Sequence, residues 1–273
     1  MTTPPRSGEV RALTPEVSAN VRPHHTRHHN RYTACAASGA FVALLSLCVS
    51  DGHGATLQVS PVIVNLLPTQ PATTLTLGNT GDLPIHGQLR VYAWTQRDGE
   101  NVLSPTEAVV ASPPILRIEP GEQQIVRLVR VDPEPLQSEQ SFRLLVDELP
   151  AVDEAPGEGL TIRLRYSLPV FVQASEAHAP ALQFDVRMPQ GELEVHNAGQ
   201  RHAQLGATRV LDASGRGVQL TRGLLGYVLA GQTRRFAVRW PAGVPPVGPF
   251  TVESRVDTVP MRFAAGAAAD GEH

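Results

Sequence analysis

The chain has 273 residues, a formal net charge of −3, 23 glycines, 24 prolines and only 5 % aromatic residues. This length accommodates two domains of ordinary size, and the charge gives no electrostatic footprint for nucleic acid. The composition therefore argues against a nucleic-acid-binding protein and favours β domains with many turns.

An export signal is predicted first along the chain. Arg27 and Arg31 precede the uncharged apolar run 33–49, and small residues follow near 52–55. A basic flank, a short apolar core and small residues are typical of a secretory signal peptide. The run is shorter than the roughly 18–20 residues of a membrane helix, which favours cleavage over a retained anchor, the alternative. We therefore predict an export extension over residues 1–54.

Both cysteines, Cys35 and Cys48, lie inside this extension. The mature chain would then contain neither a disulfide nor a catalytic thiol. Four histidines in the extension have a spacing that suits a metal on a helix, but proline and arginine surround them and acidic partners are missing, so we expect no metal: His24, His25, His28 and His29. Three later histidines show no ligand spacing and are expected on the surface: His178, His196 and His202.

Seven segments with strand character follow, separated by turn signals, and they predict an all-β immunoglobulin-like sandwich over 55–174. Pro61 breaks the first segment, Asp98-Gly99 is a hairpin-type turn, and Ser112-Pro113 is a candidate cis peptide. The segments are 57–66, 73–78, 87–96, 109–118, 124–131, 142–149 and 160–173.

The same pattern recurs after a small, polar linker and predicts a second immunoglobulin-like domain over 175–264. Its predicted strands are 183–188, 192–196, 203–212, 218–227, 233–240 and 250–256. The remaining tail, 265–273, is small and polar and is expected to be disordered.

Strict alternation marks the last strand of the first domain. Its apolar row consists of Leu160, Ile162, Leu164, Tyr166 and Leu168, with polar or basic residues between them. A period of two indicates a strand with one apolar face. Such a strand at a domain edge invites pairing with another chain, and we interpret this pairing as its function.

Charged residues beside this row suggest a second feature. If the loop 150–159 closes a hairpin, Arg143 lies opposite Tyr166 and close to Arg165, and the two guanidinium groups repel each other unless an anion lies between them. The alternative is that solvent or the neighbouring acids Asp147 and Glu148 neutralise both arginines. Adjacent strand residues point to opposite faces, so these acids do not form a catalytic carboxylate pair.

No nucleophile, metallopeptidase or phosphate-loop motif occurs in the chain. We therefore expect neither an enzyme nor a cofactor.

Several motifs together resemble the PapD-like periplasmic chaperones of chaperone–usher pili, most closely the archaic Csu-type branch. They occur in order at 79–82 (NTGD), 90–94 (RVYAW), 112–115 (SPPI), 142–150 (FRLLVDELP), 165–171 (RYSLPVF) and 226–229 (GYVL). The resemblance extends over nearly all of 56–264 and is stronger in the first domain.

The resemblance implies two immunoglobulin-like domains in an L-shaped arrangement, in a periplasmic protein. It also implies donor-strand complementation, in which the chaperone lends a strand to an incomplete pilus subunit, one-to-one, and delivers it to an outer-membrane usher. Leu160, Ile162 and Leu164 match the family's donor positions. A free chaperone that caps its own strand by dimerising is a further expectation, because an exposed aliphatic edge otherwise aggregates.

One part of the family pattern is missing. The better-known branch anchors the subunit's terminal carboxylate with an arginine and a lysine, and those positions hold Pro61 and Pro169 here. The anchor role is therefore expected for Arg143 or Arg165. Glu148 and Arg127 are expected to be structural residues at the domain junction. The alternative function is a secreted immunoglobulin-like structural or adhesive surface protein.

Overall fold

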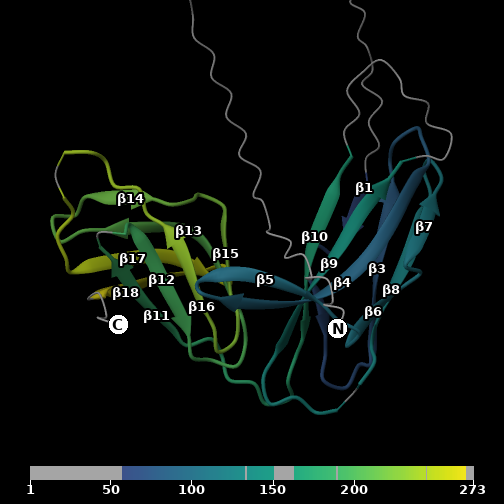
Figure 1. Ribbon diagram of the computed structural model, residues 1–273, viewed down its shortest axis with the longest axis horizontal. Helices are drawn as coiled ribbons and strands as arrows, with labels where there is room; N and C mark the ends of the chain where they lie inside the picture. The colour runs from purple at the N-terminus through teal and green to yellow at the C-terminus, as the bar shows by residue number, and fades with distance from the viewer. Residues whose placement is uncertain (1–56, 133, 151–162, 189, 244, 269–273) are drawn as a thin grey trace, which may run out of the picture. The chain divides into compact units, whose positions relative to one another are not determined.

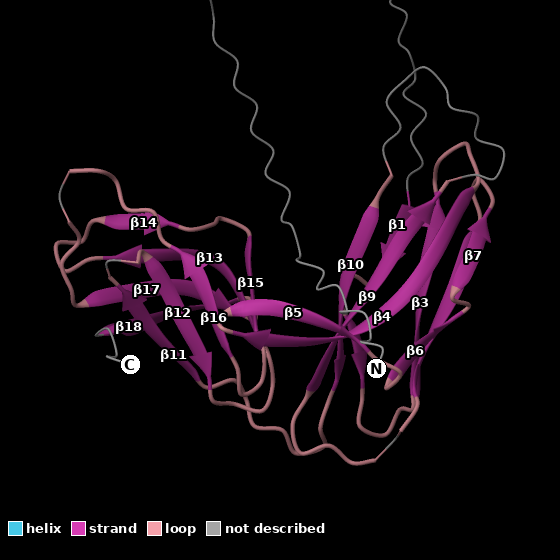
Figure 2. Cartoon of the chain, viewed as in Figure 1, coloured by secondary structure: helices cyan, strands magenta, loops and turns pink. Residues whose placement is uncertain are grey.

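The computed structural model describes residues 57–132, 134–150, 163–188, 190–243 and 245–268. Every regular secondary-structure element in these residues is a β-strand, as Figure 2 shows, and this confirms the all-β prediction. None of the described residues lies in a helix long and apolar enough to cross a bilayer. The predicted export extension, with its apolar run and both cysteines, lies outside the described residues.

Two facing sheets form the first domain (Figure 1). The four-stranded sheet has the order β1 (Leu57–Ser60), β3 (Ala72–Asn79), β8 (Gln123–Arg130) and β6 (Val109–Ser112). The six-stranded sheet has the order β2 (Val64–Leu66), β10 (Arg165–Val172), β9 (Gln140–Leu149), β4 (Ile85–Arg97) and β5 (Glu100–Pro105), with β7 (Ile115–Ile118) paired to β4.

Prolines explain why two predicted strands are each divided. The segment 57–66 splits into β1 and β2 around Pro61, and 109–118 splits into β6 and β7 around Pro113. In both cases the two halves belong to opposite sheets. Proline donates no amide hydrogen to a ladder, so pairing stops there and the chain crosses to the other sheet. The Ser112–Pro113 peptide bond is cis, as the sequence suggested.

Strand β5 was not predicted. It pairs antiparallel with the end of β4, with Trp94 opposite Leu103, and Asp98 and Gly99 make the turn with φ values of 53° and 77°. The turn signal was recognised in the sequence, but the strand after it has too little apolar alternation to be detected.

The second domain is built on one eight-stranded sheet system (Figure 1). Its strands are β11 (Leu182–Arg187), β12 (Glu192–Asn197), β13 (Ala203–Leu211), β14 (Gly217–Gln219), β15 (Leu224–Val228), β16 (Thr233–Ala237), β17 (Phe250–Val256) and β18 (Val259–Ala268). Strand β18 pairs with both β17 and β11, so it includes the first residues of the tail that was expected to be disordered.

Each domain has its own apolar core, made by residues that alternate along the strands. The first core includes Leu75, Leu128, Leu144 and Val170, and the second is centred on Phe184 and its neighbours. A third, smaller aromatic cluster joins residues from both domains. Several side chains of β10 pack into the first core and are therefore not exposed to a partner.

Candidate functional site

The apolar row on β10 is shared between the domain's own core and the surface. Leu168 is 6 % exposed and belongs to the first core, and Tyr166 packs against it. Leu164 continues the same face but is 40 % exposed. Leu160 and Ile162 lie outside the described residues. The expectation that Tyr166 and Leu168 project towards a partner is therefore wrong, because their side chains fill the domain interior.

The outer edge of β10 is covered along only part of its length. On one side β10 pairs with β9 from Arg165 to Val172. On the other side β2 pairs only with Val170–Val172. Within the part of the chain that the structure describes, no strand covers this side of β10 from Arg165 to Pro169. An uncovered edge of this kind offers main-chain donors and acceptors to another strand.

The predicted hairpin register of the two arginines is wrong. Arg143 lies opposite Pro169, not Tyr166, and Arg165 lies opposite Asp147. Among the described residues, the pairing of β9 with β10 runs from Arg165 to Val172, and most of the predicted loop 150–159 lies outside the described residues. Both arginines share the outward face of the sheet, but they are four residues apart along it and do not face each other.

Asp147 neutralises Arg165. This carboxylate is 8 % exposed in a cluster with two arginines. Arg90 Nη2 of β4 donates to Asp147 Oδ2 at 2.6 Å, and Arg165 Nε of β10 donates to Asp147 Oδ1. Burial by itself would raise the pKa of the Asp147 carboxyl, but the two arginine hydrogen bonds outweigh it and hold the pKa below its usual value. For Arg165, therefore, neutralisation by a neighbouring acid is the correct alternative.

Arg143 has a different environment. Its guanidinium carbon lies 3.8 Å from the centre of the Trp94 ring and 5.6 Å from that of Tyr227, and Nη1 donates a long hydrogen bond of 3.5 Å to the Ser167 carbonyl. Burial lowers the pKa of Arg143 to about 10, although Tyr227 raises it in part. The group therefore stays charged at neutral pH. No carboxylate pairs with it among the described residues.

The aromatic residues below Arg143 were not identified from the sequence. Trp94, Phe171 and Tyr227 form a buried cluster, in which Tyr227 meets the edge of Trp94 with 5.6 Å between ring centres. His202 stacks on Phe171 at 3.5 Å, so it does not lie free on the surface as expected. Its Nδ1 lies 2.7 Å from a carboxylate oxygen of Glu139, whose side chain is 1 % exposed.

The side chain of Gln96 binds main-chain groups beside this cluster. Its Nε2 donates to the Tyr227 carbonyl at 2.8 Å, and the amide of Leu229 donates to its Oε1 at 3.0 Å. The buried side-chain amide of Gln96 thus donates with its nitrogen and accepts with its oxygen in the same contact. This contact gives no signal in the sequence, because Tyr227 and Leu229 are more than a hundred residues away from Gln96.

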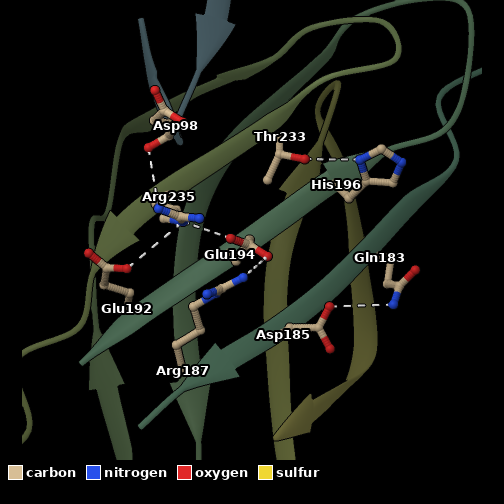
Figure 3. Close-up of polar contacts among 9 residues, drawn as sticks. All are labelled: Asp98, Gln183, Asp185, Arg187, Glu192, Glu194, His196, Thr233 and Arg235. Carbon is tan, nitrogen blue, oxygen red and sulfur yellow. Dashed lines mark hydrogen bonds and ion pairs between the residues drawn. The ribbon is translucent and has the colours of Figure 1, made fainter. Parts of the chain in front are cut away.

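The turn between β4 and β5 makes a second set of contacts, with Arg235 of β16, and Figure 3 draws the one from Asp98. The amide of Arg235 donates to the Gly99 carbonyl at 3.0 Å, and Arg235 Nη1 donates to the Asp98 carbonyl at 3.4 Å. Glu194 binds Arg235 at 2.7 Å and Arg187 at 2.8 Å (Figure 3). Burial by itself would raise the pKa of Glu194, but the hydrogen bonds from the two arginines outweigh this effect and lower the pKa below its usual value. The carboxylate is therefore ionised.

The two predicted junction residues are not at this contact. Glu148 lies towards the end of β9, whereas Glu139, which contacts His202, precedes the start of that strand. The two glutamates are nine positions apart, which corresponds to roughly 30 Å along a strand. Arg127 is exposed on β8, where it pairs with Thr74 of β3 in the four-stranded sheet, whereas Glu139 and Glu148 belong with the six-stranded sheet. Assigning both to the junction was wrong, because strand assignment alone does not say which end of a strand meets the other domain.

A cavity of about 410 Å³ lies beside the exposed start of β10. Its lining includes Arg90, Asp147, Glu148, Leu164 and Arg165. It is a charged recess next to the uncovered edge. Among the described residues, no group of three or more histidine, cysteine or acidic side chains is placed to hold a metal ion.

Comparison with known proteins identifies the first domain. Residues 56–177 match the family model of the PapD N-terminal domain, described as a pili and flagellar-assembly chaperone. This is a chaperone family and not an enzyme class. The comparison with curated protein sequences gave no match.

Solved structures give the same answer for the fold. One is the chaperone CsuC in a complex with the tip adhesion subunit CsuE, a pre-assembly complex from archaic chaperone–usher Csu pili of Acinetobacter baumannii. It shares 27 % identity at a TM-score of 0.62, over 79 % of this chain and 100 % of that chain. The Escherichia coli chaperone DraB has 19 % identity and a TM-score of 0.53, over 78 % and 97 % of the two chains. The Pseudomonas aeruginosa chaperone CupB2 has 19 % identity and a TM-score of 0.52, over 77 % and 100 %.

The resemblance found in the sequence is thus confirmed, as are two immunoglobulin-like β-sandwich domains. Residues 56–177 match the model of the PapD N-terminal domain of pilus chaperones, and over 79 % of the chain the fold is similar to that of the pilus chaperone CsuC.

Proposed function

We propose that this protein is a periplasmic chaperone that binds pilus subunits one-to-one by donor-strand complementation and delivers them to an outer-membrane usher. The family of its first domain supports the chaperone role. The similar CsuC structure contains a chaperone bound to a tip subunit, and we extend that kind of partner to this chain.

The observation that carries the proposal is that the apolar side chains on one face of the last strand change from buried to exposed towards Leu164. Tyr166 and Leu168 pack inward, whereas Leu164, the next residue on the same face, is exposed. Strand addition needs main-chain bonds at an open edge and alternate side chains that fill pockets, and the edge beside Leu164 offers both. Burying each aliphatic side chain contributes about 1.5–3 kcal/mol. Leu160, Ile162 and Leu164 are the donor residues in this proposal.

For the subunit's terminal carboxylate, the proposed anchor is Arg143. Arg165 binds Asp147, whereas the half-buried Arg143 contacts, among the described residues, only aromatic rings and one carbonyl through a long hydrogen bond. A guanidinium binds a carboxylate in a bidentate manner, and the bond strengthens where water is excluded. A carboxylate placed there would offset the cost of burying the charge.

Co-purification tests the proposal. We expect the full-length gene, tagged at its C-terminus and co-expressed with each pilin from the neighbouring genes, to yield one soluble complex whose light-scattering mass equals one copy of each chain. The tagged protein should be missing from purified fibres, because a chaperone leaves before assembly. If no pilin is recovered, or if the protein stays in the fibre, the alternative of a structural or adhesive surface protein replaces this proposal.

The free chaperone should cap its own edge. The uncovered part of β10 and the exposed Leu164 make a second copy the nearest available partner. We expect light scattering over a concentration series to show a monomer that converts to a dimer, and added pilin to reverse the conversion. A mass that stays at one chain at high concentration would contradict self-capping.

A further inference from the structure

We propose that Asp147 and Glu148 are positioning residues that hold Leu164 and Arg165, where the described part of the donor strand begins, against β9. This inference rests on the proposed strand donation and extends it to the acid pair beside the donor segment. The two residues act from opposite faces of β9, because adjacent strand residues point in opposite directions.

Asp147 acts on the outward face of the sheet, at the start of β10. It lies level with Gln88 of β4 on one side and with Arg165 of β10 on the other. Its carboxylate receives hydrogen bonds from Arg90 and Arg165, and Arg165 is the first residue of β10. One buried acid therefore connects three neighbouring strands where the last of them begins. Charge-assisted bonds of this kind are stronger than neutral ones.

Glu148 ends the ladder. Its amide donates to the Leu164 carbonyl at 3.1 Å, as a normal antiparallel pair requires. The amide of Leu164, however, donates to the Glu148 carboxylate oxygen Oε2 at 3.2 Å. The carboxylate thus takes the place of a main-chain carbonyl, and assigned β10 starts one residue later.

Both contacts lie next to the exposed Leu164, at the end of the described pairing between β9 and β10. A donor strand that is already held in place at Leu164 and Arg165 loses less conformational freedom when it pairs with a subunit. The acid pair therefore raises affinity without contacting the subunit's groove. It also explains the adjacency of two acids that cannot act together as a catalytic pair.

Amide hydrogen exchange on the free chain tests the positioning directly. We compare the wild type with Asp147→Asn, Glu148→Gln and the control Asp212→Asn, which removes a buried, arginine-bound carboxylate from the second domain. We expect the protection factors of the Leu164 and Tyr166 amides to fall about tenfold in the first two variants, the effect of one lost charge-assisted hydrogen bond, and to stay unchanged in the control. Pilin binding should weaken by a similar factor.

A pH profile separates positioning from general stability. The pKa of Asp147 is lowered in the folded chain, so its contribution is complete above the usual carboxyl pKa and is lost as the pH falls through the folded value. Protection at Tyr166, whose amide has no contact with the Glu148 carboxylate, should therefore fall in acid in the wild type and stay flat in Asp147→Asn. If the protection factors are unchanged in both acid-pair variants and the wild type still forms a pilin complex, the inference is overturned but the proposed function is not. A wild-type chain that recovers no pilin would overturn the proposed function instead.

Discussion

Replacing Leu164 with aspartate should abolish the complex with a pilus subunit while the chaperone stays folded. Leu164 is largely outside the core, so the charge remains in water in the free protein. In a complex it would enter an apolar pocket, where the lost burial and the unpaired charge together cost about 3 kcal/mol or more. That cost weakens binding at least roughly a hundredfold. Pulldown of the co-expressed pilin, with circular dichroism of the free variant, measures both effects.

Two further variants make the result specific. Ile125→Asp places the same charge on an aliphatic side chain that is 62 % exposed on β8, in the opposite sheet, and should leave the pilin complex intact. Leu164→Ala should give an intermediate loss, because it removes contact area without adding charge. Full recovery of pilin by Leu164→Asp would contradict strand donation at this position.

Much of the fold could be predicted because it depends on local alternation. The apolar period of two located most strands, and the prolines marked where two of them divide between sheets. Two strands escaped detection for local reasons. Strand β5 has weak apolar alternation, and β18 ends in alanine and glycine, a composition that resembles a frayed tail.

The functional face was predicted less well, because it depends on register and on distant contacts. Arg143 was placed opposite Tyr166 from an assumed loop length, and an error of three residues, from Tyr166 to Pro169, reverses the face on which the partner lies. Alternation also cannot say where a core ends. Tyr166 and Leu164 look alike in the sequence, but only Leu164 lies beyond the packed interior.

Replacing Arg143 should remove the preference for a free carboxyl terminus while the fold is retained. Burial disfavours the charged form of Arg143, in line with its lowered pKa, while the cation–π contact with Trp94 favours it, so the uncharged Arg143→Met should be about as stable as the wild type. Wild-type protein should bind a pilin with its native C-terminus about tenfold or more tightly than the same pilin extended by a tag, since a bidentate ion pair contributes about 1.5–3 kcal/mol. In Arg143→Met the two affinities should become equal.

Arg165→Gln is the matched comparison, because this arginine already binds Asp147. We expect it to weaken both pilins by the same factor, since it loosens the start of β10 without removing the anchor. If Arg165→Gln erased the preference and Arg143→Met preserved it, the anchor would be assigned to the wrong arginine. Arg143 is a half-buried cation over the Trp94 ring without a carboxylate partner among the described residues, which is the arrangement that a site for an incoming anion requires. The stability of Arg143→Met shows whether a lost preference comes from the anchor or from the fold.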